Sequence, residues 1–378
     1  MSAGTDPDAG AVLDDRHDAA TVARELASKL ASRARHVCLL IGAGASCAAG
    51  LPTLEELQKQ VVDALPNPRK AQATALLADR NLEEGLSRLR RLRNVLSGDE
   101  KVGGLTAEDA AELDAAICAG IMSEIKIEGS NSDAFVQLAS WAARMENEHP
   151  LELFTTNYDL LIELGLERVG VPYFDGFIGS VRAAFLPELV EPHDAPPSRG
   201  LPAGFVRLWK LHGSVNWRLS SEASEVRMVR TGQEHVDGVV AIYPSDEKYD
   251  QSRRVPFVVL MDRFRRALQE PETITITTGF SFRDGHLNET LFEAASRHPR
   301  SEVLALCYDT IPDEVAQWAA TTRNLVALSP EDAIIDGRRA AWRPSEDIPG
   351  VFEGGRFLLG DFAHLAAFLA RKVAPADG

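Results

Sequence analysis

His36-Val-Cys-Leu-Leu-Ile41, followed directly by Gly42-Ala-Gly44, decides the fold of this chain of 378 residues. A mostly apolar run of this length that ends in a glycine turn is typical of a strand buried on both faces of a parallel sheet. Further on, Thr53-Leu-Glu-Glu56 has the spacing of a capping box, which predicts that a helix begins there. A strand, a glycine turn and a helix in this order predict the first unit of an α/β fold.

The same succession of an apolar run and a helical pattern recurs along the chain. It is found again at 151–168, 273–295, 303–320 and 357–373. Repeated alternation of this kind predicts a parallel sheet with helices packed on its faces. We therefore expect an α/β fold with a largely parallel central sheet.

Two long segments interrupt this alternation. Residues 54–149 have an almost entirely helical pattern, and residues 217–255 are irregular with short strand-like pieces. We expect the first to be a large helical insertion and the second a smaller irregular or β insertion. An acidic tail and a helix at 1–35 are expected to precede one α/β domain over 36–372.

The charge balance limits the partners. Lys and Arg number 40 and Asp and Glu 56, which leaves a formal net charge of −16. An acidic chain offers no broad surface to a phosphate backbone, so we expect no strong binding of nucleic acid by this chain alone. The exception is a basic cluster at Arg88, Arg90, Arg91 and Arg93. It is either a solvated face that pairs with neighbouring acids or a patch for a partner or nucleic acid.

Cysteine usage bears on metal binding and compartment. Cys38, Cys47, Cys118 and Cys307 are scattered without a C-x-x-C pair. This excludes a four-cysteine zinc ribbon and argues against a disulfide framework, so we expect no metal and a reducing compartment. The first residues lack the basic and apolar regions of a signal peptide, and no stretch reads as a membrane span. These features predict a cytoplasmic protein without a membrane partner.

Four segments with chemically suitable side chains follow predicted strands. They are Gly42–Ser46, Thr155–Asp159, Leu211–Ser214 and Gly279–Ser281. Because the carboxyl ends of parallel strands meet at one edge of a sheet, where ligands bind in such folds, we expect the four segments to form one site.

Each segment also has a purely structural interpretation. The glycines at 42 and 44 suit a phosphate held by backbone amides, or only a tight turn. Asn157 and Asp159 are either site residues or helix caps. His212 is either a structural histidine or, beside a ribose, a group that takes a hydroxyl proton near neutral pH.

Taken together, the segments resemble the sirtuin family of NAD-consuming enzymes. The matching segments, in family order, are Gly42-Ala-Gly-Ala-Ser-Cys-Ala-Ala-Gly-Leu-Pro52, Thr155-Thr-Asn-Tyr-Asp159, Leu211-His212-Gly213, Gly279-Phe-Ser281 and Gly360-Asp361. The resemblance implies a Rossmann-like sheet that binds NAD as the substrate.

The resemblance also implies roles for single residues. Those expected to hold the phosphates, or the adenosine ribose and phosphate side, are Gly42, Ala43, Gly44, Ser46, Gly279 and Ser281. Asp159 is expected to meet the nicotinamide carboxamide. Asn157 is expected to bind the nicotinamide ribose and to place the attacking water. His212 is expected to contact the ribose hydroxyls as a general base or orienting group.

The sequence departs from sirtuin deacylases in the parts that bind zinc and the acyl-lysine. Residues 213–270 contain no cysteine, so the small insertion replaces the zinc module, and Pro52-Thr53-Leu54-Glu55 stands where the deacylases read P-D-F-R. The pattern is more similar to the zinc-less sirtuin-like NAD hydrolases of bacterial antiviral defence. In that group, infection triggers NAD depletion.

This resemblance implies an NAD hydrolase that releases nicotinamide and ADP-ribose. The alternatives are an NAD-dependent protein deacylase or ADP-ribosyltransferase, and a non-catalytic nucleotide-sensing subunit. Because unrestrained NAD hydrolysis is toxic, we expect control by assembly as a homo-oligomer or by a partner. Similarity of size and plan indicates a hexameric translocase-type ATPase as that partner.

Overall fold

The central sheet has the predicted α/β architecture. The computed structural model describes residues 16–190, 202, 204–222, 225–232, 240–242 and 255–371. Within these residues one sheet has nine strands in the order β14-β13-β12-β11-β10-β1-β2-β6-β3. Its strands span Val37–Ile41 (β1), Leu151–Thr155 (β2), Tyr173–Phe174 (β3), Val206–Lys210 (β6), Ile274–Thr278 (β10), Glu302–Leu306 (β11), Leu325–Leu328 (β12), Asp332–Ile335 (β13) and Arg338–Ala341 (β14).

Strands β3, β6, β2, β1, β10, β11 and β12 pair in parallel, whereas at one edge β13 pairs antiparallel with both β12 and β14. The predicted parallel sheet is therefore confirmed.

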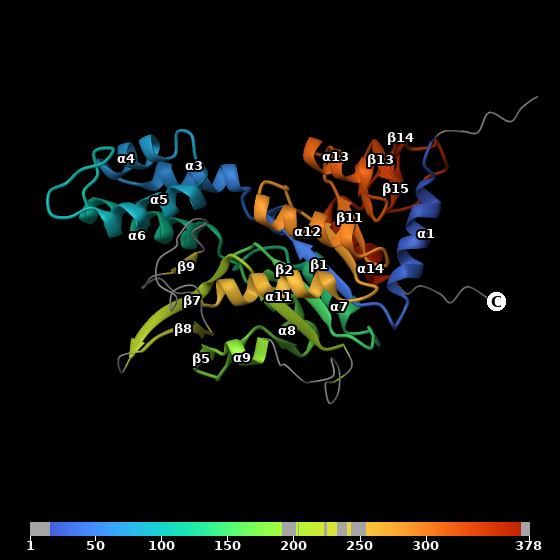
Figure 1. Cartoon of the computed structure of the whole chain (residues 1–378), viewed down its shortest axis with the longest axis horizontal. Helices are drawn as coiled ribbons and strands as arrows, with labels where there is room; N and C mark the ends of the chain where they lie inside the picture. Colours follow the sequence, from blue (N-terminus) through green and yellow to red (C-terminus); the bar gives the residue numbers. More distant parts are fainter. Residues whose placement is uncertain are drawn as a thin grey trace, which may run out of the picture.

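Helices cover both faces of this sheet (Figure 1). One face packs against α1 (Ala19–Leu30), α7 (Asp133–Ala142), α8 (Leu161–Val169) and α14 (Phe362–Ala370). The other packs against α11 (Phe257–Gln269), α12 (Gly285–Arg297) and α13 (Asp313–Thr321). The short helix α9 (Pro187–Val190) contacts α11.

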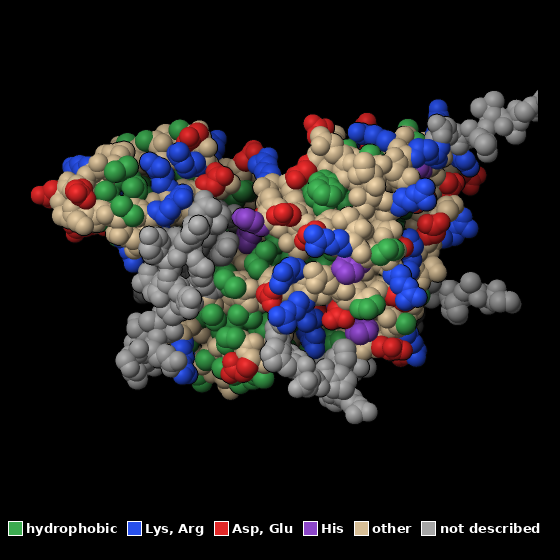
Figure 2. Space-filling model, viewed as in Figure 1, with side chains coloured by type: hydrophobic (Ala, Val, Ile, Leu, Met, Phe, Trp, Pro, Cys, Tyr) green, Lys and Arg blue, Asp and Glu red, His purple; other side chains and the backbone are tan. Residues whose placement is uncertain are grey.

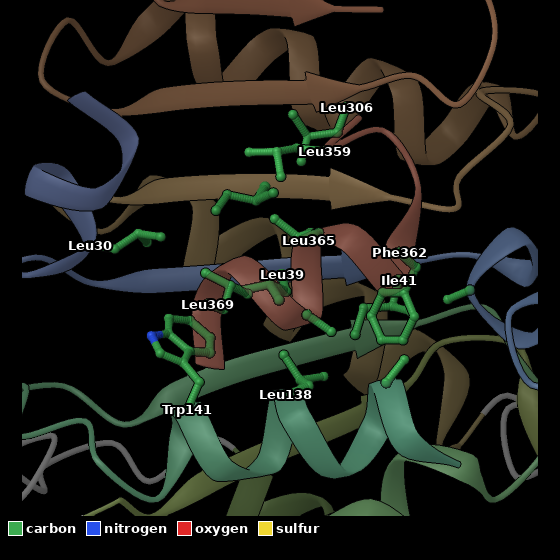
Figure 3. Close-up of a cluster of buried hydrophobic side chains, with 14 of the residues drawn as sticks. Leu30, Leu39, Ile41, Leu138, Trp141, Leu306, Leu359, Phe362, Leu365 and Leu369 are labelled. Carbon is green, nitrogen blue, oxygen red and sulfur yellow. The ribbon is translucent and has the colours of Figure 1, made fainter. Parts of the chain in front are cut away.

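Strand β1 shows why an unbroken apolar run was needed. Leu39 and Ile41 belong to the core of the first face, and Cys38 and Leu40 to the core of the second. Figure 3 shows Leu39 among Leu365 and Leu369 of α14 and Leu138 of α7, all members of the same buried cluster. Since alternate residues of a strand point to opposite faces, burial on both faces requires every position to be apolar.

Most of the helices between β1 and β2 form a separate cluster. The short helix α2 (Ala43–Cys47) follows β1 directly and packs in the core of the sheet through Ala45. After it come α3 (Leu54–Ala64), α4 (Arg69–Leu76), α5 (Leu82–Val95) and α6 (Ala107–Glu124). Helices α3 to α6 share a core of their own and project from the body of the molecule (Figure 1). Helix α7 also lies within 54–149, yet it packs in the core of the sheet.

The capping box predicted at Thr53 is present in the structure. Capping boxes start α3 at Thr53 and α6 at Thr106. Within the basic cluster, Arg90 donates to Asp114 over 3.0 Å, and both side chains are largely buried. On the face drawn in Figure 2, Lys and Arg side chains are interspersed with Asp and Glu. Arg90 therefore serves the packing of α5 on α6.

A second, antiparallel sheet begins before the predicted insertion at 217–255. Its order is β4-β5-β8-β7-β9, with β4 at Phe177–Ile178, β5 at Arg182–Phe185, β7 at Gly213–Glu222, β8 at Glu225–Thr231 and β9 at Val240–Ile242. Trp217 is buried against Phe177 and Phe257, which fixes this sheet on α11. Residues 223–224, 233–239 and 243–254 lie outside the described residues, as do 1–15 and 372–378. The domain boundaries stay predictions.

The last predicted strand differs from the expectation. Residues 352–357 form a small hairpin, β15 (Phe352–Glu353) with β16 (Arg356–Phe357), instead of a strand of the main sheet. Gly354 and Gly355 at its tip both have positive φ angles, of 56° and 78°. Two consecutive residues with positive φ form the tight turn that joins neighbouring antiparallel strands, so pairing is local here.

Glu152 ties several elements together at the amino end of the sheet. Its side chain is 1% exposed and accepts hydrogen bonds from Trp209 Nε1 (2.7 Å) and from Arg263 Nε (3.0 Å). Arg207 Nη1 lies 3.3 Å and His36 Nε2 3.4 Å from its Oε1. Burial lowers the pKa of both arginines. One carboxylate on β2 thus compensates buried groups from β6, from α11 and from His36, which directly precedes β1.

Replacing Glu152 should strongly destabilise the fold. Glu152→Ala leaves two largely buried guanidinium groups without their shared carboxylate, and removing one partner of a buried ion pair costs about 3–5 kcal/mol. We expect that loss in the free energy of unfolding from urea denaturation. The control is Glu146→Ala, which breaks only the exposed pair with Arg33 and should change little. Equal stabilities for the two variants would contradict the role of Glu152.

Candidate functional site

The site lies where the strand order reverses. After β1 the chain adds β2 and β6 on one side, then returns to add β10, β11 and β12 on the other. In open α/β sheets, ligands bind outside the carboxyl ends of the strands at such a point. A cavity of about 1580 Å³ lies here, lined by the segments after β1, β2, β6, β10 and β11. This exceeds the roughly 300–1,000 Å³ of ordinary ligand pockets.

The glycine segment after β1 and the segment after β10 touch through their backbones. Gly42 N donates to Thr278 O over 2.9 Å, and Gly44 N donates to Gly279 O over 2.8 Å. A Cβ at Gly42 would lie 2.5 Å from Gly279 O, and one at Gly279 would lie 2.3 Å from Ala45 N. Gly279 also has a φ of 59°. These glycines are therefore required by the contact between the two loops, in addition to any role toward a ligand.

Asn157, Ser46 and Asp159 form a buried hydrogen-bonded series at the cavity wall. Asn157 Nδ2 donates to Ser46 Oγ over 2.8 Å and to Gly42 O over 3.0 Å. Ser46 Oγ in turn donates to Asp159 Oδ2 over 2.6 Å. The loop after β2 is thus held against the glycine loop after β1.

Asp159 and Asn157, both in the loop after β2, differ in their relation to the start of α8. Asp159 Oδ1 accepts from Leu161 N, the first residue of α8, over 3.0 Å, although the N-cap position of this helix is Leu160. Asn157 instead turns its amide nitrogen to the glycine loop, and its Oδ1 is buried without a hydrogen-bond partner among the described residues. A buried acceptor without a donor costs free energy unless a ligand or water completes it.

His212 reaches the cavity because β6 ends beside β2. Leu211 N donates to Thr155 O over 2.8 Å, and the buried Lys210 donates from Nζ to the backbone O of Asp159 and, over 3.1 Å, to Glu163. His212 itself is 7% exposed. Its Nε2 lies 3.1 Å from Asp284 Oδ2.

Asp284 is a site residue that the sequence analysis missed. It is the N-cap of α12, where its Oδ1 accepts from His286 N and Leu287 N. Burial raises the pKa of this carboxyl, but the hydrogen bond and charge of His212 outweigh it and the pKa is lowered. An Asp before a helical pattern signals a cap. Its pairing with a histidine 72 positions away has no sequence signal.

The loop after β10 is strained as well as close to the glycine loop. Phe282 has a φ of 55°, rare for a side-chain-bearing residue, and Asn288 Nδ2 holds its carbonyl over 2.8 Å. Tyr308, 71% exposed, follows β11 and lines the same cavity, as do Gly360 and Asp361. Tyr308 presents an aromatic ring to the cavity. It was not among the predicted site residues, because an isolated tyrosine belongs to no recognisable sequence motif.

The structure brings most of the predicted residues to one cavity. Those that line it are Ala43, Gly44, Ser46, Asn157, Asp159, His212, Gly279 and Ser281. Gly42 lies behind them and contacts the loop after β10. In the part of the chain that the structure describes, no group of three metal-ligating side chains is found, and no helix is long and apolar enough to cross a membrane.

The fold is that of a Rossmann-type α/β protein, with a cavity at the switch point of its sheet. Residues 151–328, just under half of the chain, match the SIR2-like domain family. This segment includes Asn157, His212 and Asp284 but not the glycine loop after β1. Among solved structures, the chain is similar to "a Sir2 homolog–NAD complex", with a TM-score of 0.42, 13% identity and 92% of each chain covered. No curated protein matches the chain.

Gly279→Ala should separate the two loops. The methyl group would meet the backbone of Ala45 and the residue would hold an unfavourable φ, together about 2–4 kcal/mol of destabilisation. The measurement is the free energy of unfolding. Gly232→Ala is the control, because Gly232 is exposed and a Cβ added there would meet no atom within 4 Å. The control should tolerate the change within about 0.5 kcal/mol. A Gly279→Ala protein as stable as the control would refute the required contact.

Proposed function

We propose that this chain hydrolyses NAD to nicotinamide and ADP-ribose in the cavity at the switch point. The single observation that carries the proposal is the buried Oδ1 of Asn157, which has no donor among the described residues. Asn157 and His212 both line the cavity. The matched SIR2-like family and the motif order described above support the same substrate.

The residues present suit the groups of NAD. A ribose hydroxyl or a water is a hydrogen-bond donor and would complete Asn157 Oδ1. Tyr308 provides an apolar face on the side of β11, where the adenine would lie. The loops after β1 and β10 present backbone at the centre of the cavity, where the diphosphate would pass. We assign Ala43, Gly44, Ser46, Gly279 and Ser281 to that central part.

The reaction replaces a carbon–nitrogen bond by a carbon–oxygen bond. The bond between C1 of the ribose and nicotinamide breaks, a water oxygen attacks C1, and one proton is released. Asn157 positions the ribose and the water. His212 binds the ribose hydroxyls and takes the proton. Positioning and charge complementarity, without a covalent nucleophile, are sufficient for such a step.

Water as the acceptor is favoured by the walls of the cavity. Helix α3 starts directly at Leu54 after Pro52-Thr53, and Glu55 of this helix lines the cavity. Asn81, the N-cap of α5, and Glu84 of α5 line it as well. The helical cluster therefore occupies one side of the site. By the resemblance to sirtuins, the small sheet with Trp217 in its core occupies the place in the chain where deacylases carry a zinc module.

The biological role that we propose is NAD depletion in antiviral defence, in the cytoplasm. Depletion would harm the cell if it were continuous, so the activity needs control. We propose that control comes from assembly, either with further copies of this chain or with a hexameric translocase-type ATPase.

Asn157 and His212 should be needed for catalysis more than for folding. We expect Asn157→Ala and Asn157→Asp to lower NAD cleavage by about 10²-fold or more, and His212→Ala by about 10²–10⁴-fold. Nicotinamide release and the thermal midpoint are measured for each variant. Asn94→Ala and His298→Ala, away from the cavity, are the controls. Folded Asn157→Ala and His212→Ala proteins with wild-type rates would refute the site.

The reaction products show which molecule accepts the ADP-ribosyl group. We expect nicotinamide and ADP-ribose in equal amounts from NAD and water alone, in the presence of oligomer or ATPase partner if one is required. Release of nicotinamide only with an acylated peptide or a protein acceptor would indicate a deacylase or an ADP-ribosyltransferase. Binding of NAD without any cleavage would indicate a nucleotide-sensing subunit.

A further inference from the structure

We propose that Asp284 is a positioning residue that fixes the ring of His212, with the hydrogen on Nε2 and the lone pair of the neutral ring on Nδ1. The effect of Asp284 on catalysis rests on the proposed NAD hydrolysis. The geometry that carries it is independent of the substrate.

The carboxylate of Asp284 is itself held in place. Its Oδ1 accepts from two backbone amides at the start of α12, His286 N over 3.0 Å and Leu287 N over 3.1 Å. These two bonds set the plane of the carboxylate and leave Oδ2 for His212. A side chain fixed by backbone amides can orient a second side chain more closely than one that rotates in solvent.

The protonation of the pair follows from its surroundings. The histidine and aspartate side chains are 8% and 28% exposed, so their hydrogen bond is largely shielded from water. The lowered pKa of Asp284 keeps the carboxylate ionised at neutral pH. An ionised carboxylate only accepts hydrogen bonds, so Nε2 must be the donor. In the neutral imidazole the proton is then absent from Nδ1.

This arrangement defines what His212 does in the proposed reaction. With its ring held by Asp284, His212 takes a proton from a ribose hydroxyl or from the attacking water in the proposed reaction and later releases it to solvent. While the ring is protonated, the ionised Asp284 stabilises its positive charge. Asp284 touches neither substrate nor water in this scheme and acts through His212.

Asp284→Asn tests the orientation with almost no change in shape. An asparagine can keep Oδ1 on the two amides of α12, since Asn is as good an N-cap as Asp. Its NH2 group then faces Nε2, which must accept, so the ring hydrogen moves to Nδ1. We expect the thermal midpoint to stay close to that of the wild type, kcat to fall by about 10²-fold or more, and KM for NAD to change little.

Asp18→Asn is the matched control. Asp18 caps α1, where it accepts from Thr21 N over 2.7 Å, and α1 is no part of the cavity wall. The same substitution at this cap should leave kcat unchanged. A loss of activity in Asp284→Asn that is accompanied by a clearly larger loss of stability than in Asp18→Asn, with an unchanged tautomer, would show a merely structural role and overturn the proposal.

The tautomer itself is read without any substrate. Nitrogen NMR of the protein with labelled histidine, with His212→Ala for assignment, distinguishes Nε2–H from Nδ1–H. We expect Nε2–H in the wild type and a shift to Nδ1–H in Asp284→Asn. An Nδ1–H wild-type ring, or the same tautomer in both proteins, would overturn the proposal. If the wild type shows the Nε2–H ring but releases no nicotinamide, the proposed function fails while the positioning by Asp284 stands.

Discussion

The backbone contact between the glycine loop after β1 and the loop after β10 is the constraint on which the site depends. Gly42, Gly44 and Gly279 meet with no side chain between them, and their amides and carbonyls bond directly. A side chain at these positions would push the two loops apart at the carboxyl ends of β1 and β10. Because backbone groups form the contact, it does not depend on side-chain rotamers. It thus gives the cavity a rigid centre.

The loops that form the other walls of the cavity are held to this centre by single hydrogen bonds. Asn157 and Asp159 hold the loop after β2 to the glycine loop through Ser46, and Lys210 ties the end of β6 to Asp159. His212 then joins the end of β6 to the start of α12 through Asp284. Each polar group in such a buried series needs a hydrogen-bond partner, because an unpaired one costs free energy. Among the described residues Asn157 Oδ1 is left without one, at the place where a ligand would bind.

At the opposite end of the strands, the same sheet is stabilised by different chemistry. Glu152 satisfies buried donors from β6 and α11, and the two faces are filled by apolar side chains such as Leu39 and Leu365. Bonds at the amino end and apolar packing on the faces support the fold. The carboxyl end can therefore keep a strained residue, Phe282, and an incompletely bonded one. This division between a stable frame and a less stable edge is expected of a functional site.

Local sequence patterns were sufficient for the α/β class, for the capping box at Thr53, and for the segments that follow β1, β2, β6 and β10. These features depend on neighbours in the chain: burial of alternate residues, caps within one turn, and glycines after a strand. They failed for the strand expected at the start of 357–373, where two glycines with positive φ made a local hairpin, and for α7, which joined the main core. Nothing in a local pattern states with which face a helix will pack.

The partners across the site were decided only by the tertiary structure. That Gly44 donates to Gly279, that Ser46 bridges Asn157 and Asp159, and that Asp284 accepts from His212 all follow from the order in which the strands assemble. Hydrogen bonds and close contacts act over a few ångströms, whereas these residues are separated by tens to hundreds of positions. By itself the sequence determined which chemical groups lie at the ends of strands. The topology of the sheet determined which of those groups meet.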